Sequence, residues 1–296
     1  MDNSTLRTPT TRVLDGFLAR YRGNTRTLYE IDMRVYLDWC EADGTDPLRA
    51  VRSDVERFAR HLEEVRGNKA ATVAHRLGVI RMFYRVALSD GVIDRDPTIF
   101  LHIPKVHRDP HSIAWLDRSQ MGRLMRAASE TSVAHETLVT LMGVLGLRVS
   151  EACAVNVEDF HEDEMGYRVL RVVGKGNKPA TIPIPIPSLR VIERARDGRT
   201  SGPLILTKRG NRQNRAGAYD WVKRLATKAG LDPNLHPHAL RHSAITGALD
   251  AGVELRDAQV FARHADPRTT AHYDRRSFDL DRHAVHAVAR WMHTAA

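Results

Sequence analysis

A proline-containing segment about a third of the way along the chain constrains the fold more than any other feature. Residues 103–112 read IPKVHRDPHS, with prolines at 104 and 110 among charged residues and histidines. Proline lacks the backbone N–H of a helix and clashes with the preceding turn, so no helix can cross this segment. A length of 296 residues is also typical of about two domains. We therefore expect one domain over residues 1–102, a linker over 103–112 and a second domain over 113–296.

The first of these domains is predicted to be helical. Apolar residues recur every three or four positions from Thr11 onward, which is the period of a helix with one buried face. Asn24 or Thr25 can cap a second helix, and Ser53 and Glu56 are spaced as a capping box for a third. The helix that begins near Thr11 is followed by predicted helices at 24–41, 53–66 and 71–90.

The fourth helix of this domain carries basic side chains beside its apolar residues. Leu77, Ile80 and Phe83 have the spacing of a buried face. The basic residues could lie against DNA phosphates, although a solvated basic face explains them equally well. These candidate DNA-binding residues are Lys69, Arg76, Arg81 and Arg85.

The second domain is predicted to combine helices with a small β-sheet, so that the whole chain is mainly α. Asp117 and Gln120 form a candidate capping box at the start of its first helix. Residues 167–173 and 181–186 predict two strands joined by a hairpin turn at 174–178. Further helices are expected at 135–144, 188–196, 220–230 and 279–293.

The composition narrows the partners and the location. A net charge of +9 and a pI near 9.9 favour a polyanionic partner, although an ordinary basic surface is equally consistent with the charge alone. Cys40 and Cys153 are far apart in apolar surroundings, which predicts neither a disulfide nor a zinc site. No run of about 18 apolar residues is present to span a membrane, and the N-terminal residues do not resemble a signal peptide. We therefore expect a cytoplasmic protein.

A densely basic stretch, KRGNRQNR, spans residues 208–215. A solvated loop is the simplest explanation for it. In a DNA-binding protein, however, arginine, asparagine and glutamine commonly contact phosphates and base edges. The candidate DNA-binding residues here are Lys208, Arg209, Arg212 and Arg215.

The strongest indication of chemistry is a group of six polar side chains in the second domain. His238 and Arg241 are three residues apart, so they share one face of a helix. Two guanidiniums can clamp the non-bridging oxygens of a phosphodiester, and a tyrosine can attack its phosphorus. His238 and His242 also have the spacing of a zinc-binding helix, but Arg241 would put a permanent charge beside the metal. The six residues are Arg148, Lys175, His238, Arg241, His264 and Tyr273.

The order and spacing of these six residues resemble the tyrosine recombinase (phage integrase) family. The family's pattern is Arg, Lys, His-x-x-Arg, His or Trp, then Tyr, and every position is filled here. The resemblance extends from about Thr11 to the end of the chain and includes the GLRVSEA stretch around Arg148. It implies that the first domain is a core-binding domain, one half of a clamp around DNA, and that the second is the catalytic domain.

The resemblance also implies how the substrate phosphate would be held. Arg148, Arg241 and His264 would bind the scissile phosphate and stabilise the charge that develops during attack. Glu151 lies three residues after Arg148, so on a helix its carboxylate can orient that guanidinium.

The remaining residues of the group would move protons. Ionising a free tyrosine at pH 7 costs about 4 kcal/mol, and surrounding cations lower that cost. His238 would accept the proton of Tyr273, and Lys175 would protonate the departing 5′-oxygen. The product would be a phosphotyrosine on the DNA 3′ end, which conserves the phosphodiester energy. No metal, ATP or other cofactor is therefore expected.

The resemblance leaves alternatives within and outside the family. A site-specific recombinase is favoured, and a chain with no room for an N-terminal arm-binding domain suggests a simple enzyme of the Xer type. A type IB topoisomerase shares the catalytic residues and would relax supercoils without a defined site. A catalytically silent DNA-binding regulator is a third possibility, which the complete set of six residues disfavours.

Two features near the C-terminus complete the expectations. Arg263 stands where the family commonly has glycine, so it must make a helix-ending turn in another way or contact phosphate itself. The predicted helix at 279–293 is expected to dock on a neighbouring protomer in a ring of four on two DNA duplexes. Accessory recombination proteins are candidate further partners.

Overall fold

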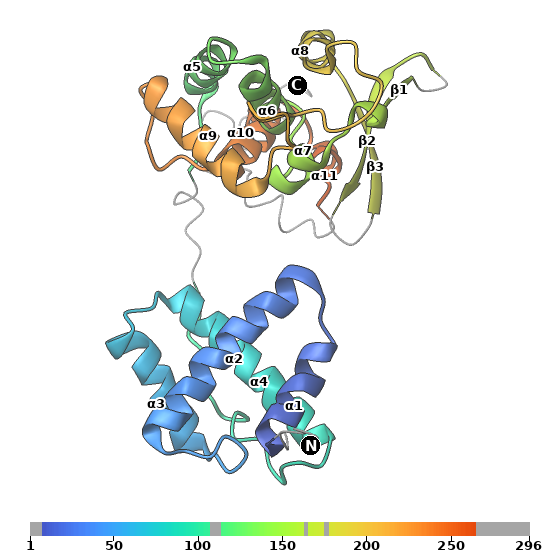
Figure 1. Ribbon diagram of the computed structural model, residues 1–296. Helices are drawn as coiled ribbons and strands as arrows, with labels where there is room; N and C mark the ends of the chain where they lie inside the picture. The colour runs from blue at the N-terminus through green and yellow to red at the C-terminus, as the bar shows by residue number, and fades with distance from the viewer. Residues whose placement is uncertain (1–7, 107–113, 163–164, 175–177, 265–296) are drawn as a thin grey trace, which may run out of the picture. The chain divides into compact units, whose positions relative to one another are not determined.

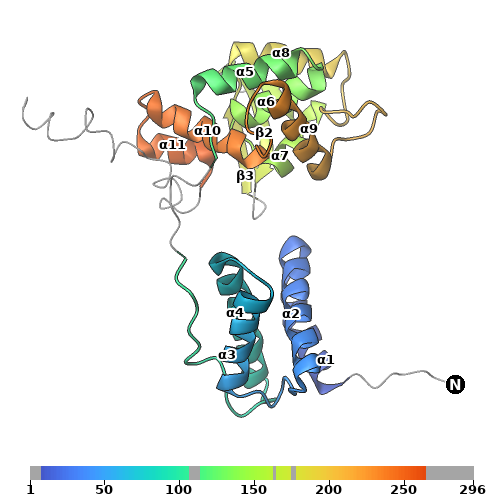
Figure 2. The same cartoon turned by 90° about the vertical axis from the view of Figure 1, so that its left-hand side faces the viewer.

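The computed structural model describes residues 8–106, 114–162, 165–174 and 178–264 (Figure 1). The chain divides into two compact units, residues 1–108 and 109–296, each with its own apolar core. The first unit is helical, and the second combines helices with a three-stranded sheet, as the turned view also shows (Figure 2). This arrangement confirms the predicted fold class. None of the helices in the described ranges is both long and apolar enough to cross a membrane.

The first unit packs its helices around aromatic side chains. Phe17, Phe58 and Phe83 are fully buried. The hydroxyls of Tyr36 and Tyr84 lie 2.5 Å apart, and Tyr84 donates to the carbonyl of Pro47 at 2.9 Å, so the polar ends of both buried rings are satisfied. The elements are α1 (Pro9–Ala19), α2 (Gly23–Asp43), α3 (Arg52–Arg60), the π-helical turn η1 (His61–Val65) and α4 (Ala70–Ser89).

Two predicted helix caps in this unit are wrong. Helix α2 begins at Gly23, so Asn24 and Thr25 lie inside its first turn. Helix α3 begins at Arg52, where the carboxylate of Asp54 accepts a hydrogen bond of 2.8 Å from the N–H of Val51. This hydrogen bond between Asp54 and the residue before the helix replaces the predicted capping box of Ser53 and Glu56.

The second unit is built around one central helix. Helix α6 buries every residue from Thr137 to Met142, because other helices pack on all its sides. The capping box predicted for Asp117 and Gln120 is confirmed, with hydrogen bonds of 2.8 and 3.0 Å. The helices are α5 (Arg118–Ser129), α6 (Val133–Gly143), α7 (Val149–Ala154), the 3₁₀ turn η3 (Val157–Asp159), α8 (Ile186–Arg196), α9 (Arg215–Lys228), α10 (Pro237–Asp250) and α11 (Leu255–Ala262).

The sheet is antiparallel in the order β1-β2-β3. Its strands are β1 (Phe160–Glu162), β2 (Arg168–Gly174) and β3 (Lys178–Pro183), and Gly174 pairs with Lys178 at the hairpin end. The strand predicted at 181–186 is displaced, because β3 is an edge strand and accommodates Pro179 and Pro183. Helix α9 likewise begins five residues before the predicted position.

Candidate active site

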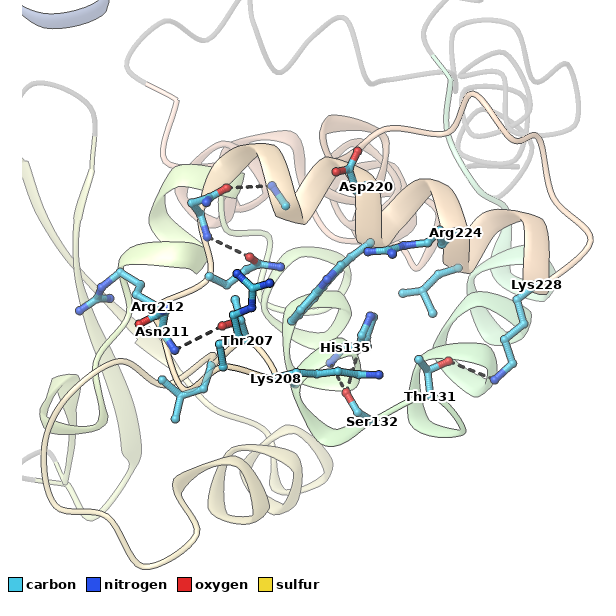
Figure 3. A pocket seen from close by; sticks show the side chains of 18 residues that line it. Thr131, Ser132, His135, Thr207, Lys208, Asn211, Arg212, Asp220, Arg224 and Lys228 are labelled. Atoms are coloured by element: carbon cyan, nitrogen blue, oxygen red, sulfur yellow. Dashed lines mark hydrogen bonds between the residues drawn. The ribbon is translucent and has the colours of Figure 1, made fainter.

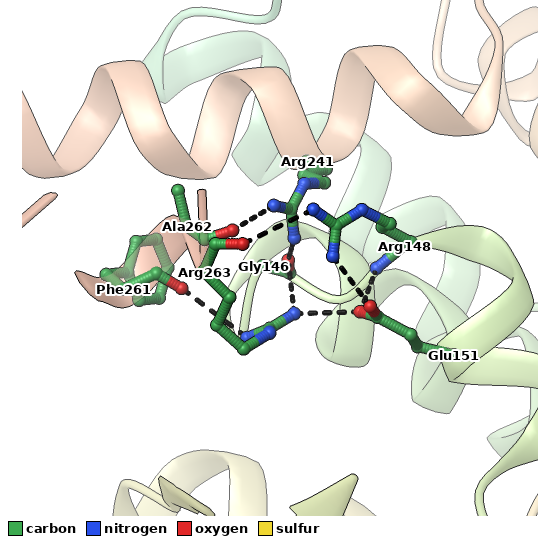
Figure 4. Close-up of polar contacts among 7 residues, drawn as sticks. All are labelled: Gly146, Arg148, Glu151, Arg241, Phe261, Ala262 and Arg263. Carbon is green, nitrogen blue, oxygen red and sulfur yellow. Dashed lines mark hydrogen bonds and ion pairs between the residues drawn. The ribbon is translucent and has the colours of Figure 1, made fainter. Parts of the chain in front are cut away.

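Helix α10 brings two of the predicted catalytic residues to one place. It runs through the core of the second unit, and Arg241 on its buried face is 1% exposed. A buried guanidinium needs hydrogen-bond acceptors. Arg241 donates to the carbonyls of Gly146 and Ala262, which belong to the turn after α6 and the end of α11 (Figure 4). These two bonds fix its guanidinium between segments that are far apart in the sequence.

Arg148 is held at the start of α7. Gly146, with φ +64°, makes the turn from α6, and a Cβ at this glycine would lie 2.9 Å from the ring of Phe261. Arg148 then caps α7, and its backbone N–H donates to Glu151 Oε2 at 2.8 Å. Its guanidinium donates to Glu151 Oε1 at 2.7 Å. Glu151 therefore lies against Arg148 and fixes both its backbone and its side chain.

The site contains a cavity of about 280 Å³. Arg148, His238 and Arg241 line it together. Arg215 and Tyr219 of α9 line it as well, with the Arg215 guanidinium 5.8 Å from the centre of the Tyr219 ring. The cavity is thus strongly positive and has the size and donors to take a phosphate group.

Two of the six predicted catalytic residues, Lys175 and Tyr273, lie outside the described residues. The strand that leads to Lys175 nevertheless ends beside the site. A Cβ built on Gly174 would lie 3.6 Å from Glu151 Oε1. The hairpin that carries Lys175 therefore begins next to the Arg148–Glu151 pair.

The two histidines of the site, His238 and His264, have lowered pKa values and are neutral at pH 7. Burial lowers the pKa of His264 to about 4, assisted by the charges of Arg241 and Arg148. Desolvation within the cavity and the charge of Arg241 lower the pKa of His238 as well. At pH 7 the His238 ring can therefore accept a proton. His242 is buried beside the site, with Nδ1 3.4 Å from Thr246 Oγ1.

Comparison with known proteins identifies the family. The model of the phage integrase family matches residues 114–279, and that of the phage integrase N-terminal SAM-like domain matches residues 14–91. The chain belongs to the phage integrase family. This membership confirms the resemblance inferred from the six residue positions.

Individual relatives agree with the family assignment. Tyrosine recombinase XerD of Bifidobacterium longum is 31% identical over 269 residues, which cover 84% of this chain and 85% of the relative. Tyrosine recombinase XerC of Alcanivorax borkumensis is 31% identical over 239 residues, 76% of this chain and 75% of the relative. These two relatives extend the similarity across both units.

Solved structures share the integrase fold. The Tn1549 transposon integrase in complex with transposon right end DNA has a TM-score of 0.75 and 20% identity, over 96% of this chain and 99% of that one. A lambda integrase dimer bound to a COC′ core site has a TM-score of 0.71 and 15% identity, over 88% of this chain and 94% of that one.

A second, larger pocket of about 1040 Å³ lies on the other face of α9 (Figure 3). We call it the basic pocket. Its wall includes Trp221, on which the ring of His135 stacks at a centroid distance of 4.0 Å. Among the residues that the structure describes, Lys208, Arg209 and Arg224 have no ion-pair or hydrogen-bond partner for their charged groups. Their charges are therefore available to an anion.

Other predicted DNA-binding residues support the fold. The Arg212 guanidinium donates to the carbonyl of Ala154 at 2.8 Å and so caps α7. In the first unit, Arg76 pairs with Asp32 at 3.2 Å, and Arg81 donates to the carbonyl of Leu101 at 2.8 Å. A role in DNA binding stays a prediction for all the basic residues named from the sequence. Of those on α4 and at its start, Lys69 and Arg85 have exposed side chains.

One site residue, Tyr219, and one contact of Arg263 were not found from the sequence. Tyr219 lines the catalytic cavity, and its position four residues after Arg215 on one helix face was the available signal. The side chain of Arg263 reaches Glu151 Oε2 at 2.8 Å, a contact between residues 112 positions apart that no local pattern indicates.

Proposed function

We propose that this integrase is a site-specific tyrosine recombinase that cuts and rejoins DNA through a 3′-phosphotyrosine intermediate. The observation that carries the proposal is the convergence of Arg148, His238 and Arg241 on one positively charged cavity. The relatives named tyrosine recombinases and the integrase structures solved with DNA support double-stranded DNA as the substrate.

The arginines would bind the scissile phosphate. The guanidiniums of Arg148 and Arg241 are fixed by protein acceptors before any substrate arrives, so little reorganisation is needed when negative charge develops. His264, neutral at pH 7, would donate a hydrogen bond to the same phosphate through its ring N–H. Fixed cations would thus stabilise the transition state.

Tyr273 would attack the phosphorus and displace the 5′-oxygen. His238 would take the tyrosine proton, since its lowered pKa leaves the ring unprotonated at pH 7. Lys175, on the hairpin that begins beside Glu151, would protonate the departing 5′-oxygen. Attack by another strand's 5′-hydroxyl on the phosphotyrosine would then reverse these steps and join new partners.

The two units would share the work of holding DNA. Lys69 and Arg85 of the first unit would contact phosphates, as a core-binding domain does on its side of a clamp. In the second unit the basic pocket would bind the DNA backbone away from the cleaved phosphate, through Lys208 and Arg209.

We also propose that residues 279–293 join four protomers on two duplexes. Light scattering with and without residues 278–296 would test this.

Covalent capture tests the proposal. The protein is incubated with fragmented genomic DNA of its source without added metal, then denatured, and the DNA linked to protein is sequenced. We expect an adduct on Tyr273 at one repeated sequence, and no adduct with Tyr273→Phe. Adducts at scattered sequences would favour a topoisomerase. DNA binding without any adduct would favour a silent regulator.

A further inference from the structure

Helix α11 ends in an unusual way for this family. Arg263 adopts a left-handed conformation, with φ 51° and ψ 45°. Its N–H donates to the carbonyl of Val260 at 2.9 Å, and the N–H of His264 donates to that of Gln259 at 3.2 Å. These two bonds form the helix-ending motif that glycine usually completes. An arginine has taken the glycine's place without changing the turn.

A side chain in this conformation has a cost. The left-handed region costs a residue with a Cβ about 1–2 kcal/mol relative to right-handed backbone. Contacts of the side chain can offset this cost. The Arg263 side chain is 12% exposed, and its Nη2 lies 2.8 Å from Glu151 Oε2 and 3.2 Å from the carbonyl oxygen of Gly146. The chain therefore retains an unfavourable backbone conformation together with a buried ion pair.

The same carboxylate serves two arginines. Glu151 Oε1 accepts from the guanidinium of Arg148 at 2.7 Å, and Oε2 accepts from that of Arg263 at 2.8 Å (Figure 4). The carbonyl oxygen of Arg263 also accepts from Arg148 Nη2 at 3.5 Å. Arg148 is therefore in contact both with residue 263 and with the carboxylate that residue 263 holds.

The ionisation of Glu151 is compatible with this double pairing. Burial raises the pKa of its carboxyl, but the hydrogen bonds from Arg148 and the charges of Arg263 and Arg148 outweigh burial and lower it. The carboxylate is thus charged at neutral pH. Its side chain is 4% exposed, so water screens the two ion pairs little.

We infer that Arg263 is a positioning residue that aligns Arg148 for the scissile phosphate through the shared carboxylate of Glu151. The inference rests on the proposed function. Arg263 does not line the catalytic cavity, and its guanidinium is directed to Glu151 and Gly146, so it is not itself a phosphate ligand. Its left-handed turn also determines the direction in which the chain continues to His264.

Glycine at this position removes the ion pair and can keep the left-handed turn. Arg263→Gly relieves the left-handed backbone and removes the ion pair, so the melting temperature should change by no more than about 4 °C. DNA affinity should stay within about threefold, while single-turnover cleavage of the captured DNA site should fall by about 10- to 100-fold. Arg263→Lys, which keeps one charged contact with Glu151, should restore part of that rate. Arg256→Ala removes an exposed charge from the same helix and should leave the rate unchanged.

A double-mutant cycle tests the route through Glu151. If Arg263 acts through the carboxylate, Arg263→Gly should slow cleavage little further in a Glu151→Gln background. Independent, multiplying losses would overturn the inference. So would an unchanged rate in Arg263→Gly, or a loss that only follows weaker DNA binding or lower stability.

If the proposed function is wrong, the experiments give a different result. In that case the wild-type protein would form no adduct, and the crystal structure of Arg263→Gly would decide the inference instead. We expect the Arg148 guanidinium to turn away from its wild-type position. An Arg148 that stays in place would overturn the positioning role.

Discussion

The catalytic cavity and the basic pocket flank the same helix, α9, but the arginines that would bind the scissile phosphate and the exposed cations of the basic pocket are held in opposite ways. In the cavity, Arg241 is buried and donates to two carbonyls, and Arg148 is held by a buried carboxylate. In the basic pocket, Lys208 and Arg209 are exposed, and their charged groups have no protein partner among the described residues.

The difference follows from what each site has to do. Stabilising a transition state requires charges that are already in place, because moving them during the reaction would cost part of the gain. Holding a DNA backbone requires only positive charge near phosphates, and flexible exposed side chains supply that. The fold therefore supplies buried acceptors to Arg148 and Arg241, and it supplies none to Lys208 and Arg209 within the described residues.

The largest effect should come from loosening the fixed cations. Arg241→Lys keeps the charge but cannot reach the carbonyls of both Gly146 and Ala262, so one of the two buried hydrogen bonds is lost. We expect cleavage to fall by about 10²–10³-fold and the free energy of unfolding by about 1–3 kcal/mol. Single-turnover kinetics and urea denaturation measure the two. Arg190→Lys, at an exposed site on α8, is the control and should change neither.

A smaller and different effect should follow from reversing charges in the basic pocket. Lys208→Glu with Arg209→Glu should weaken DNA binding by about 10- to 100-fold and reduce the slope of log affinity against log salt by about two. Cleavage at saturating DNA should be unchanged. The same charge change at Arg118 and Arg190, exposed and outside both pockets, should matter far less. A slowed cleavage step at saturation would contradict the division between the two sites.

The smallest effect should appear in the pH dependence of stability. Burial, helped by the charges of Arg224 and Lys208, lowers the pKa of His135 to about 4. Between about pH 6.5 and 4 the unfolded chain binds this proton and the folded chain does not, so stability is lost as the pH falls through that window. His135→Phe keeps a ring against Trp221 and should remove about 1–2 kcal/mol of that loss, after allowance for solvent screening. Urea denaturation at pH 7 and pH 4.5 measures the loss of unfolding free energy in both proteins. An equal loss in wild type and His135→Phe would contradict the lowered pKa of His135.

Local sequence patterns predicted much of the fold. The helical period and the Asp117–Gln120 capping box identified elements that the structure confirms. Boundaries were less predictable, because they depend on which side chain reaches a free backbone group. Asp54 displaced the cap predicted at Ser53, and an edge position allowed prolines within β3. Such choices are made by neighbours in space.

The sequence by itself determined the family, through six residue types in a fixed order. Only the tertiary structure decided that Arg212 caps α7, although it belongs to the same basic stretch as Lys208 and Arg209. It also decided that Glu151 is shared by Arg148 and Arg263. The physical reason is that a cation's role depends on which acceptors surround it. Those acceptors come from α7, α11 and the turn at Gly146, which only folding brings together.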